Sequence, residues 1–258
     1  MNIFKSIYLL LSDFSIYPLE MITRLRGIPY YLANLRLWSK ENTAPSFQIR
    51  LSELRFLSWE RFASAGGTRG HYFHQDLWVA SDIYRLNIRS HVDVGSRLDG
   101  FIAHLLPFCS VTFVDLRPLN LDHVNFNFIQ GTITNLPFKD SSISSLSCLH
   151  VIEHIGLGRY GDTIDPEGFR KAANELVRVL APGGRLFLST PVGVERLVFD
   201  AHRIFDPLTV VETFAPAKLA SFHLISDAGD RMIPDASFAE ARRCKYGCGI
   251  FVFQGVAK

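Results

Sequence analysis

The stretch HVDVGSRLDGFIAHLLPFCSVTFVD, residues 91–115, decides the fold. A short apolar strand ends at Gly95, the segment FIAHLL is helical in character, and a second apolar strand ends at Asp115. This order of strand, turn, helix and strand builds a parallel sheet with its helices packed on the faces. Ligands of such sheets bind at the carboxyl ends of the strands, so Gly95 and Asp115 mark an expected binding edge.

The same rhythm continues toward the C-terminus. Three further strands are predicted at residues 126–130, 142–151 and 185–190, and two closing strands at residues 220–226 and 249–257. Apolar residues at helical spacing predict one helix over residues 75–88 and the strongest one over residues 165–180, which the APGG turn at 181–184 ends. The sequence therefore predicts a Rossmann-like α/β fold, a doubly wound, mainly parallel sheet of seven strands.

Turn-forming residues near 41–46 and at Gly66–Gly67 predict a helical N-terminal extension, residues 1–68, before the main domain, residues 69–258. The apolar run at residues 7–11 is too short to span a membrane. Residues 18–40 interleave aromatic residues and leucines with Arg24, Arg26, Arg36 and Lys40. Two interpretations stay open: a helix that packs on its own domain, which is the more common case, or a basic helix that makes a peripheral contact with a membrane surface.

Composition excludes several classes of protein. The 258 residues are 48 % hydrophobic and 20 % charged, an ordinary globular balance. With 27 Lys and Arg against 25 Asp and Glu, the chain lacks the basic excess of a dedicated nucleic-acid binder. Four scattered cysteines form no disulfide framework. Cys244 and Cys248 are close, but no second Cys/His pair with zinc spacing accompanies them, so no metal ligands are assigned. These features favour a reducing, cytoplasmic location.

Two strand-end residues predict a cofactor. Gly95 lets a ligand approach the backbone, and Asp115, 22 residues after Asp93, suits a carboxylate that accepts hydrogen bonds from both hydroxyls of a ribose. Together they favour an adenosine-containing cofactor, although each alone is equally a turn glycine or a helix cap. A dinucleotide site is disfavoured because Arg97 stands where its G-x-G-x-x-G motif needs the second glycine.

Longer motifs carry a family resemblance. QGTITNLPFKDSSISSLSCLHVIEHIG, residues 130–156, and ANELVRVLAPGGRLFLSTPVG, residues 173–193, resemble class I S-adenosylmethionine-dependent methyltransferases over about residues 91–195. GHYFHQDLWVA, HVDVGSRLDGF, CLHVIEHIGLGRYGDTIDP and VFDAHRIF more closely resemble a bacterial group within the methyltransferase-like family named domain of unknown function 268, over about residues 69–205. The name of that family records that its activity is unassigned.

The resemblance implies S-adenosylmethionine as cofactor. Asp93, Gly95 and Ser96 would line its methionine part, Asp115 would hold the ribose, Thr132 with Ile133 would border the adenine, and His150 would lie beside the sulfonium. Arg97 and Asp99 replace two glycines of the family pattern, and Thr132 replaces a frequent acidic residue. These departures leave a second hypothesis, a non-catalytic or altered domain that acts as a binding or scaffold module.

Methyl transfer to an alcohol needs a base. We expect His154, with Glu153 as its orienting partner, or else His202. The predicted substrate-binding residues are Arg159, Tyr160 and Asp162 on a glycine-rich loop, together with Arg203. The expected acceptor is a small polar or glycan hydroxyl compound, as in polysaccharide biosynthesis. Plainer roles stay open: His154 as a helix cap, Arg203 paired with Asp200, and Asp162 and Asp165 as caps of the helix at 165–180.

Two histidine motifs remain. HVIEH, residues 150–154, matches the inverted zincin motif, which needs both histidines on one helix; His150 follows a predicted strand, so a zinc hydrolase is only a minor alternative. His71 and His74 precede the main domain and are expected to belong to a lid over the cofactor, whereas Trp78 is expected in the core.

Overall fold

The computed structural model describes residues 7–8 and 11–257, so the apolar run at residues 7–11 lies partly outside the described residues. The chain divides into two compact units, Met1–Gly67 and Thr68–Lys258, where the sequence analysis placed the division between residues 68 and 69. None of the helices among the described residues combines the length and the apolar character needed to cross a membrane.

The first unit consists of helices α2 (Pro18–Leu25) and α3 (Ile28–Glu41), followed by three short 3₁₀ turns: η1 (Pro45–Phe47), η2 (Leu51–Glu53) and η3 (Ser58–Phe62). No residue of α2 or α3 is buried. Stacking holds this unit together instead: Tyr30 meets the ring of Phe62, and the guanidinium of Arg61 lies 4.0 Å from the centre of the Tyr30 ring. The contact of this unit with a membrane surface stays a prediction.

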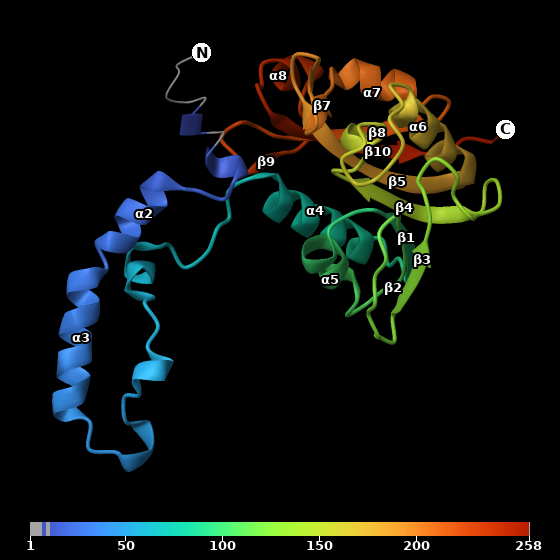
Figure 1. Ribbon diagram of the computed structural model, residues 1–258. Coiled ribbons are helices and arrows are strands. Elements are labelled where there is room, and N and C mark those ends of the chain that lie inside the picture. Colours follow the sequence, from blue (N-terminus) through green and yellow to red (C-terminus); the bar gives the residue numbers. More distant parts are fainter. Residues whose placement is uncertain (1–6, 9–10, 258) are drawn as a thin grey trace. The chain divides into compact units, whose positions relative to one another are not determined.

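The second unit is built on one sheet of eight strands in the order β3-β2-β1-β4-β5-β10-β8-β9 (Figure 1). Its strands are β1 (Ser90–Val94), β2 (Ser110–Asp115), β3 (Phe126–Gln130), β4 (Ile143–Leu149), β5 (Leu180–Val192), β8 (Lys218–Ile225), β9 (Met232–Ile233) and β10 (Gly247–Gln254). Strands β1 to β5 pair in parallel, and β10 is antiparallel to both β5 and β8. The predicted count of seven strands is wrong by one, because the two-residue strand β9 pairs with β8 and adds an eighth strand at the edge of the sheet.

Two layers of helices cover the sheet (Figure 1). On one face lie α4 (His71–Arg85), the π-helical turn η4 (Leu98–Ile102) and α5 (Ala103–Leu105); on the other lie α6 (Gly168–Val179), α7 (Pro207–Thr213) and α8 (Phe238–Arg242). The 3₁₀ turn η5 (Ile152–His154) follows β4, and β6 (Arg196–Val198) pairs with β7 (His202–Ile204) in a separate hairpin. Each layer closes its own apolar core, so the sheet is buried on both faces, as a parallel sheet requires.

Of the three segments predicted to be helical in the main domain, FIAHLL forms the end of η4 and α5, and the other two form helices with changed ends. The helix expected at 165–180 is α6, which begins at Gly168 because the Asp165 carboxylate and carbonyl accept hydrogen bonds from the amides of Glu167 and Gly168. The helix expected at 75–88 is α4, whose buried face carries His71, Gln75 and Asp76 as well as apolar residues. Trp78 is only partly buried at the edge of the core and stacks on His223. All four cysteines are free and buried.

Candidate functional site

A cavity of about 1110 Å³ opens at the carboxyl ends of β1, β2 and β4. Strand order reverses between β1 and β4, and this switch point is where α/β sheets bind their ligands. The lining includes six of the seven residues predicted for the cofactor, namely Gly95, Ser96, Asp115, Thr132, Ile133 and His150. Four segments far apart in sequence therefore meet at the predicted edge.

The turn after β1 forms one wall of the cavity. Gly95 has φ +75°, and a Cβ there would lie 3.0 Å from a methyl group of Val151, so only glycine fits without displacement. The Ser96 hydroxyl donates to Asp93 Oδ2 at 2.6 Å and accepts from the Leu149 amide at 3.0 Å. The turn is thus fixed to β4 by internal hydrogen bonds.

Asp93 does not line the cavity, which corrects its predicted role. Its carboxylate is fully buried beneath the turn and accepts hydrogen bonds from the Ser96 amide, the Ser96 hydroxyl and the Ser147 hydroxyl. Burial raises the pKa of Asp93 to about 7, because the hydrogen bonds offset only part of the desolvation. Asp93 was predicted to contact the cofactor because it lies near a strand end, but its carboxylate instead holds the turn after β1 in place.

Asp115 closes β2 at the floor of the cavity, and its carboxylate has a partner that the sequence analysis missed. Arg117 donates through its amide (2.8 Å) and Nε (3.0 Å) to Oδ1 and through Nη2 (2.8 Å) to Oδ2. The same guanidinium lies 5.0 Å from the centre of the Tyr160 ring. The position of Arg117, two residues after the strand-end carboxylate of Asp115, is the feature of the sequence from which this pairing could have been predicted.

Beyond β3, Thr132 and Ile133 form another part of the lining. The Thr132 hydroxyl lies 3.0 Å from that of Thr134, so the two hydroxyls form a small polar edge. Ile133 is buried and supplies the apolar surface beside it. Such a pair of polar edge and apolar face suits a flat heterocycle with a polar rim.

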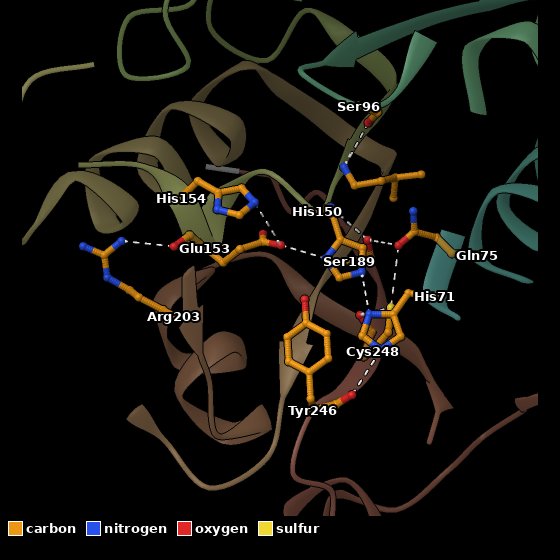
Figure 2. Close-up of polar contacts among 12 residues, drawn as sticks. His71, Gln75, Ser96, His150, Glu153, His154, Ser189, Arg203, Tyr246 and Cys248 are labelled. Atoms are coloured by element: carbon orange, nitrogen blue, oxygen red, sulfur yellow. Dashed lines mark hydrogen bonds and ion pairs between the residues drawn. The ribbon is translucent and has the colours of Figure 1, made fainter. Parts of the chain in front are cut away.

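His150 follows β4 with φ +55° and turns its ring toward Glu153 (Figure 2). Its Nδ1 lies 2.7 Å from Glu153 Oε1, whereas His154 Nε2 lies 3.7 Å from the same oxygen. Burial disfavours the charged form of both groups. Cys248 and Glu153 nevertheless raise the pKa of His150, and His150 lowers the pKa of Glu153. The predicted orienting partner of His154 is thus bound first to His150.

His154 lines the cavity, and its tautomer follows from its contacts. Nδ1 lies 2.6 Å from the carbonyl oxygen of Ala201, which can only accept, so Nδ1 carries the hydrogen and Nε2 the lone pair. Burial lowers the pKa of His154, so the ring is neutral at pH 7. His202 lies outside the cavity lining; its ring centre is 6.4 Å from that of His154 and 4.9 Å from that of Tyr246.

The predicted substrate-binding residues separate into two groups. Tyr160 and Asp162 line the cavity, and Asp162 Oδ2 accepts from the Gly156 amide at 2.7 Å. Arg159 and Arg203 lie outside the lining. Arg159 donates to the Ala201 carbonyl, and Arg203 donates to the Ile155 carbonyl at 2.7 Å while it stacks on Phe169. Arg203 therefore joins the β7 strand to the loop after β4, and the suggested pairing with Asp200 does not form.

The HVIEH histidines do not share a helix. His150 lies between β4 and η5, and His154 ends η5, so the inverted zincin geometry is absent from this segment. His71 is the first residue of α4; burial, then His150, lower the pKa of His71 to about 4. Its Nδ1 lies 3.1 Å from His150 Nε2, a contact that no motif or spacing predicted.

Comparison with known proteins identifies one family. Residues 138–226, about a third of the chain, match the family DUF268, described as a Caenorhabditis protein of unknown function. The predicted resemblance to this family is confirmed over these residues, which run from before β4 through β8. A search of curated proteins found no match.

The solved structures that this chain matches are distant in sequence. The N-methyltransferase NodS from Bradyrhizobium japonicum WM9, in complex with S-adenosylhomocysteine, is 14 % identical with a TM-score of 0.46 and covers 69 % of this chain and 86 % of its own. 1,6-Didemethyltoxoflavin-N1-methyltransferase from Burkholderia thailandensis is 13 % identical with a TM-score of 0.47, and the match covers 70 % of this chain and 79 % of that one. YcgJ from Bacillus subtilis is 13 % identical with a TM-score of 0.49, and the match covers 71 % of this chain and 99 % of that one. The Rossmann-like assignment rests on the strand order of this chain.

Proposed function

We propose that this chain is an S-adenosylmethionine-dependent methyltransferase that acts on the hydroxyl group of a small polar or glycan acceptor. One observation carries the proposal. The cavity at the switch point joins a glycine turn, a strand-end carboxylate, a threonine–isoleucine edge and a neutral histidine in one space. Enzymes with similar folds, such as NodS, hold S-adenosylhomocysteine in their structures, which supports the choice of cofactor.

The donor groups fit this cofactor. The Gly95 turn leaves its backbone open to the cavity. Each carboxylate oxygen accepts about two hydrogen bonds, so Asp115 Oδ1 is filled by the amide and Nε of Arg117, whereas Oδ2 accepts only from Nη2 and can still accept from a ribose hydroxyl. Thr132 and Ile133 supply the edge and face for a purine. When bound, the cofactor supplies an electrophilic methyl group on a sulfonium.

In this proposal the chain itself must align the acceptor and remove its proton. His154 Nε2 holds a lone pair beside the cavity, and Glu153 Oε1 at 3.7 Å stabilises the imidazolium that forms when Nε2 takes the hydroxyl proton. Asp162, Tyr160 and Lys171 give the same part of the lining both acceptors and donors, which favours a polyhydroxylated acceptor.

Calorimetry with S-adenosylhomocysteine tests the proposal. The folded wild-type chain should bind it, and Asp115→Ala should lose about 10- to 100-fold in affinity, since hydrogen bonds to a charged group contribute about 1.5–3 kcal/mol. Asp115→Asn keeps the shape of the side chain and should fall in between. His154→Ala should bind within about threefold of wild type, because its proposed partner is the acceptor.

Asp122→Ala is the matched control, because Asp122 is an exposed aspartate outside the cavity lining. Equal affinity of the Asp115 and Asp122 variants would remove the ribose assignment. A folded wild-type chain that binds neither S-adenosylhomocysteine nor S-adenosylmethionine would favour the second candidate, a non-catalytic binding module. The occupation of both Asp115 oxygens by Arg117 is the observation that speaks for that candidate.

A further inference from the structure

Three buried side chains converge beside the cavity, and of these only His150 belongs to its lining. His71 begins α4, His150 follows β4 and Cys248 lies in β10; His71 is 9 % exposed, His150 8 % and Cys248 0 %. One potential ligand atom from each lies within 4.8 Å of the other two, the only such cluster of His, Cys, Asp or Glu within residues 7–8 and 11–257. Figure 2 shows the two imidazole rings next to one another, with Cys248 overlapping His71 in this view.

The outer contacts of both histidines fix which nitrogen is bare. His71 Nε2 lies 3.1 Å from the Tyr246 carbonyl, and His150 Nδ1 lies 2.7 Å from the Glu153 carboxylate. Both oxygens accept hydrogen bonds, so these two nitrogens carry the hydrogens. The two remaining ring nitrogens, His71 Nδ1 and His150 Nε2, face one another across 3.1 Å. Two facing lone pairs repel unless a proton or a metal ion lies between them.

We propose that His71 Nδ1, His150 Nε2 and Cys248 Sγ form a binding site for one Zn²⁺ ion. Two nitrogens on a tetrahedral zinc ion, each at about 2.0–2.1 Å, lie about 3.3 Å apart, close to the 3.1 Å between these two atoms. A shared proton needs only the two nitrogens, whereas a zinc ion also uses the converging sulfur. Imidazole and thiolate bind zinc in preference to hard cations such as Mg²⁺ and Ca²⁺.

The surroundings are those of a metal ligand set. Metal-bound histidines commonly donate their second N–H to a carboxylate or a backbone carbonyl, and these two donate to Glu153 and Tyr246. Glu153 is fully buried, and its Oε2 has no hydrogen-bond partner among the residues that the structure describes. A cation on His150 would offset this carboxylate. Binding converts the Cys248 thiol to a thiolate and releases its proton to solvent.

The obvious alternative is that Cys248 acts as a nucleophile, with His150 as its base and Glu153 as the partner that orients this base. Its side chain is completely buried, however, and Cys248 is not among the residues that line the cavity. A substrate therefore has no approach to Sγ, and buried cysteines are chemically inert. A metal site does not require that a substrate reach Sγ. A bound ion would instead join the start of α4, the end of β4 and β10, three segments distant in the chain.

Metal titration of the full-length chain tests the site. Chelator-stripped protein should take up one Zn²⁺ per chain, and Co²⁺ in its place should show a thiolate-to-metal charge-transfer band. Cys248→Ser should lose that band and at least about 100-fold in zinc affinity, while Glu153→Gln keeps the band and loses about 10- to 100-fold. Zinc should also raise the unfolding temperature of wild type more than that of Cys248→Ser.

Cys244→Ser is the matched control, because Cys244 is also buried but its sulfur lies outside the cluster. It should keep both the charge-transfer band and the zinc affinity. If Cys248→Ser fails to fold, as judged by circular dichroism, His71→Asn carries the same expectation of lost affinity. Folded wild-type protein that takes up no zinc, or equal zinc affinity in the Cys244 and Cys248 variants, would overturn the site and leave His71 and His150 as a proton-sharing pair.

Discussion

Asp93 shows how a single buried residue couples the cavity to pH. Its carboxylate is fully buried, and its partners Ser96 and Ser147 belong to the cavity turn and to β4. A carboxyl group with a folded-state pKa of about 7 binds its proton more tightly in the folded chain than in the unfolded one, where the pKa is 3.8. Its contribution to stability is therefore complete below pH 3.8 and is lost as the pH rises through about 7.

Asp93→Asn removes this titration. We expect the unfolding free energy of the variant, relative to wild type, to rise with pH between about 4 and 7, by on the order of 1 kcal/mol per pH unit. Urea unfolding at several pH values measures it. Asp99→Asn is the control, because Asp99 is exposed and its pairing with Arg97 lowers the pKa of its carboxyl group. The unfolding free energy of this variant, relative to wild type, should therefore not rise with pH. Parallel curves for Asp93→Asn and wild type would contradict the raised pKa.

At the scale of elements, the C-terminal end of α6 supports the loop that lines the cavity. Arg178 donates to the carbonyls of Leu136 (3.0 Å) and Phe138 (2.9 Å) and pairs with Asp140 and Glu175. Glu175 in turn accepts from the Leu136 amide at 2.9 Å. The loop after Thr132 and Ile133 thus has its backbone groups satisfied by a helix 40 residues further along the chain.

Arg178→Ala should destabilise the domain by about 1–3 kcal/mol, because it leaves two carbonyls and the half-buried Glu175 without their charged donor. Urea unfolding measures the loss. Arg170→Ala, in the same helix, removes an exposed ion pair with Glu167 and a stacking contact on Phe169, and it should cost under about 1 kcal/mol. Equal losses in the two variants would mean that the Arg178 contacts contribute no more than surface ones.

For the whole molecule, the apolar core lies in one of the two units. Every buried hydrophobic residue among the described positions belongs to Thr68–Lys258, from Val79 to Phe253. Burial of apolar surface is the main favourable term in folding. The second unit therefore holds what it needs to fold alone.

A chain of residues 68–258 should accordingly unfold in one cooperative transition, with an unfolding free energy within about 1 kcal/mol of the corresponding transition of the full chain. The urea dependence of its circular dichroism tests this. The loss of cooperativity or aggregation of the shortened chain would show that the first unit contributes to the core.

Much of the main domain followed from local pattern. The strands ending at Gly95 and Asp115, the helix before APGG and the cavity-lining residues Ser96, Thr132 and Ile133 all lie near where the sequence predicted them, because apolar periodicity and turn residues act over a few positions. The alternation of strands and helices predicted a mainly parallel sheet, whereas the order of its strands, with β10 between β5 and β8, came from the tertiary structure.

Only the tertiary structure decided the partners of the polar side chains. Asp93 faces inward to Ser147, Glu153 binds His150 before His154, and Cys248 lies close to His71 at the start of α4. These contacts join residues from 3 to more than 100 positions apart, and no local pattern specifies which buried group will face which. The physical reason is that a buried polar group must find its partner wherever packing places one, and packing is a property of the whole fold.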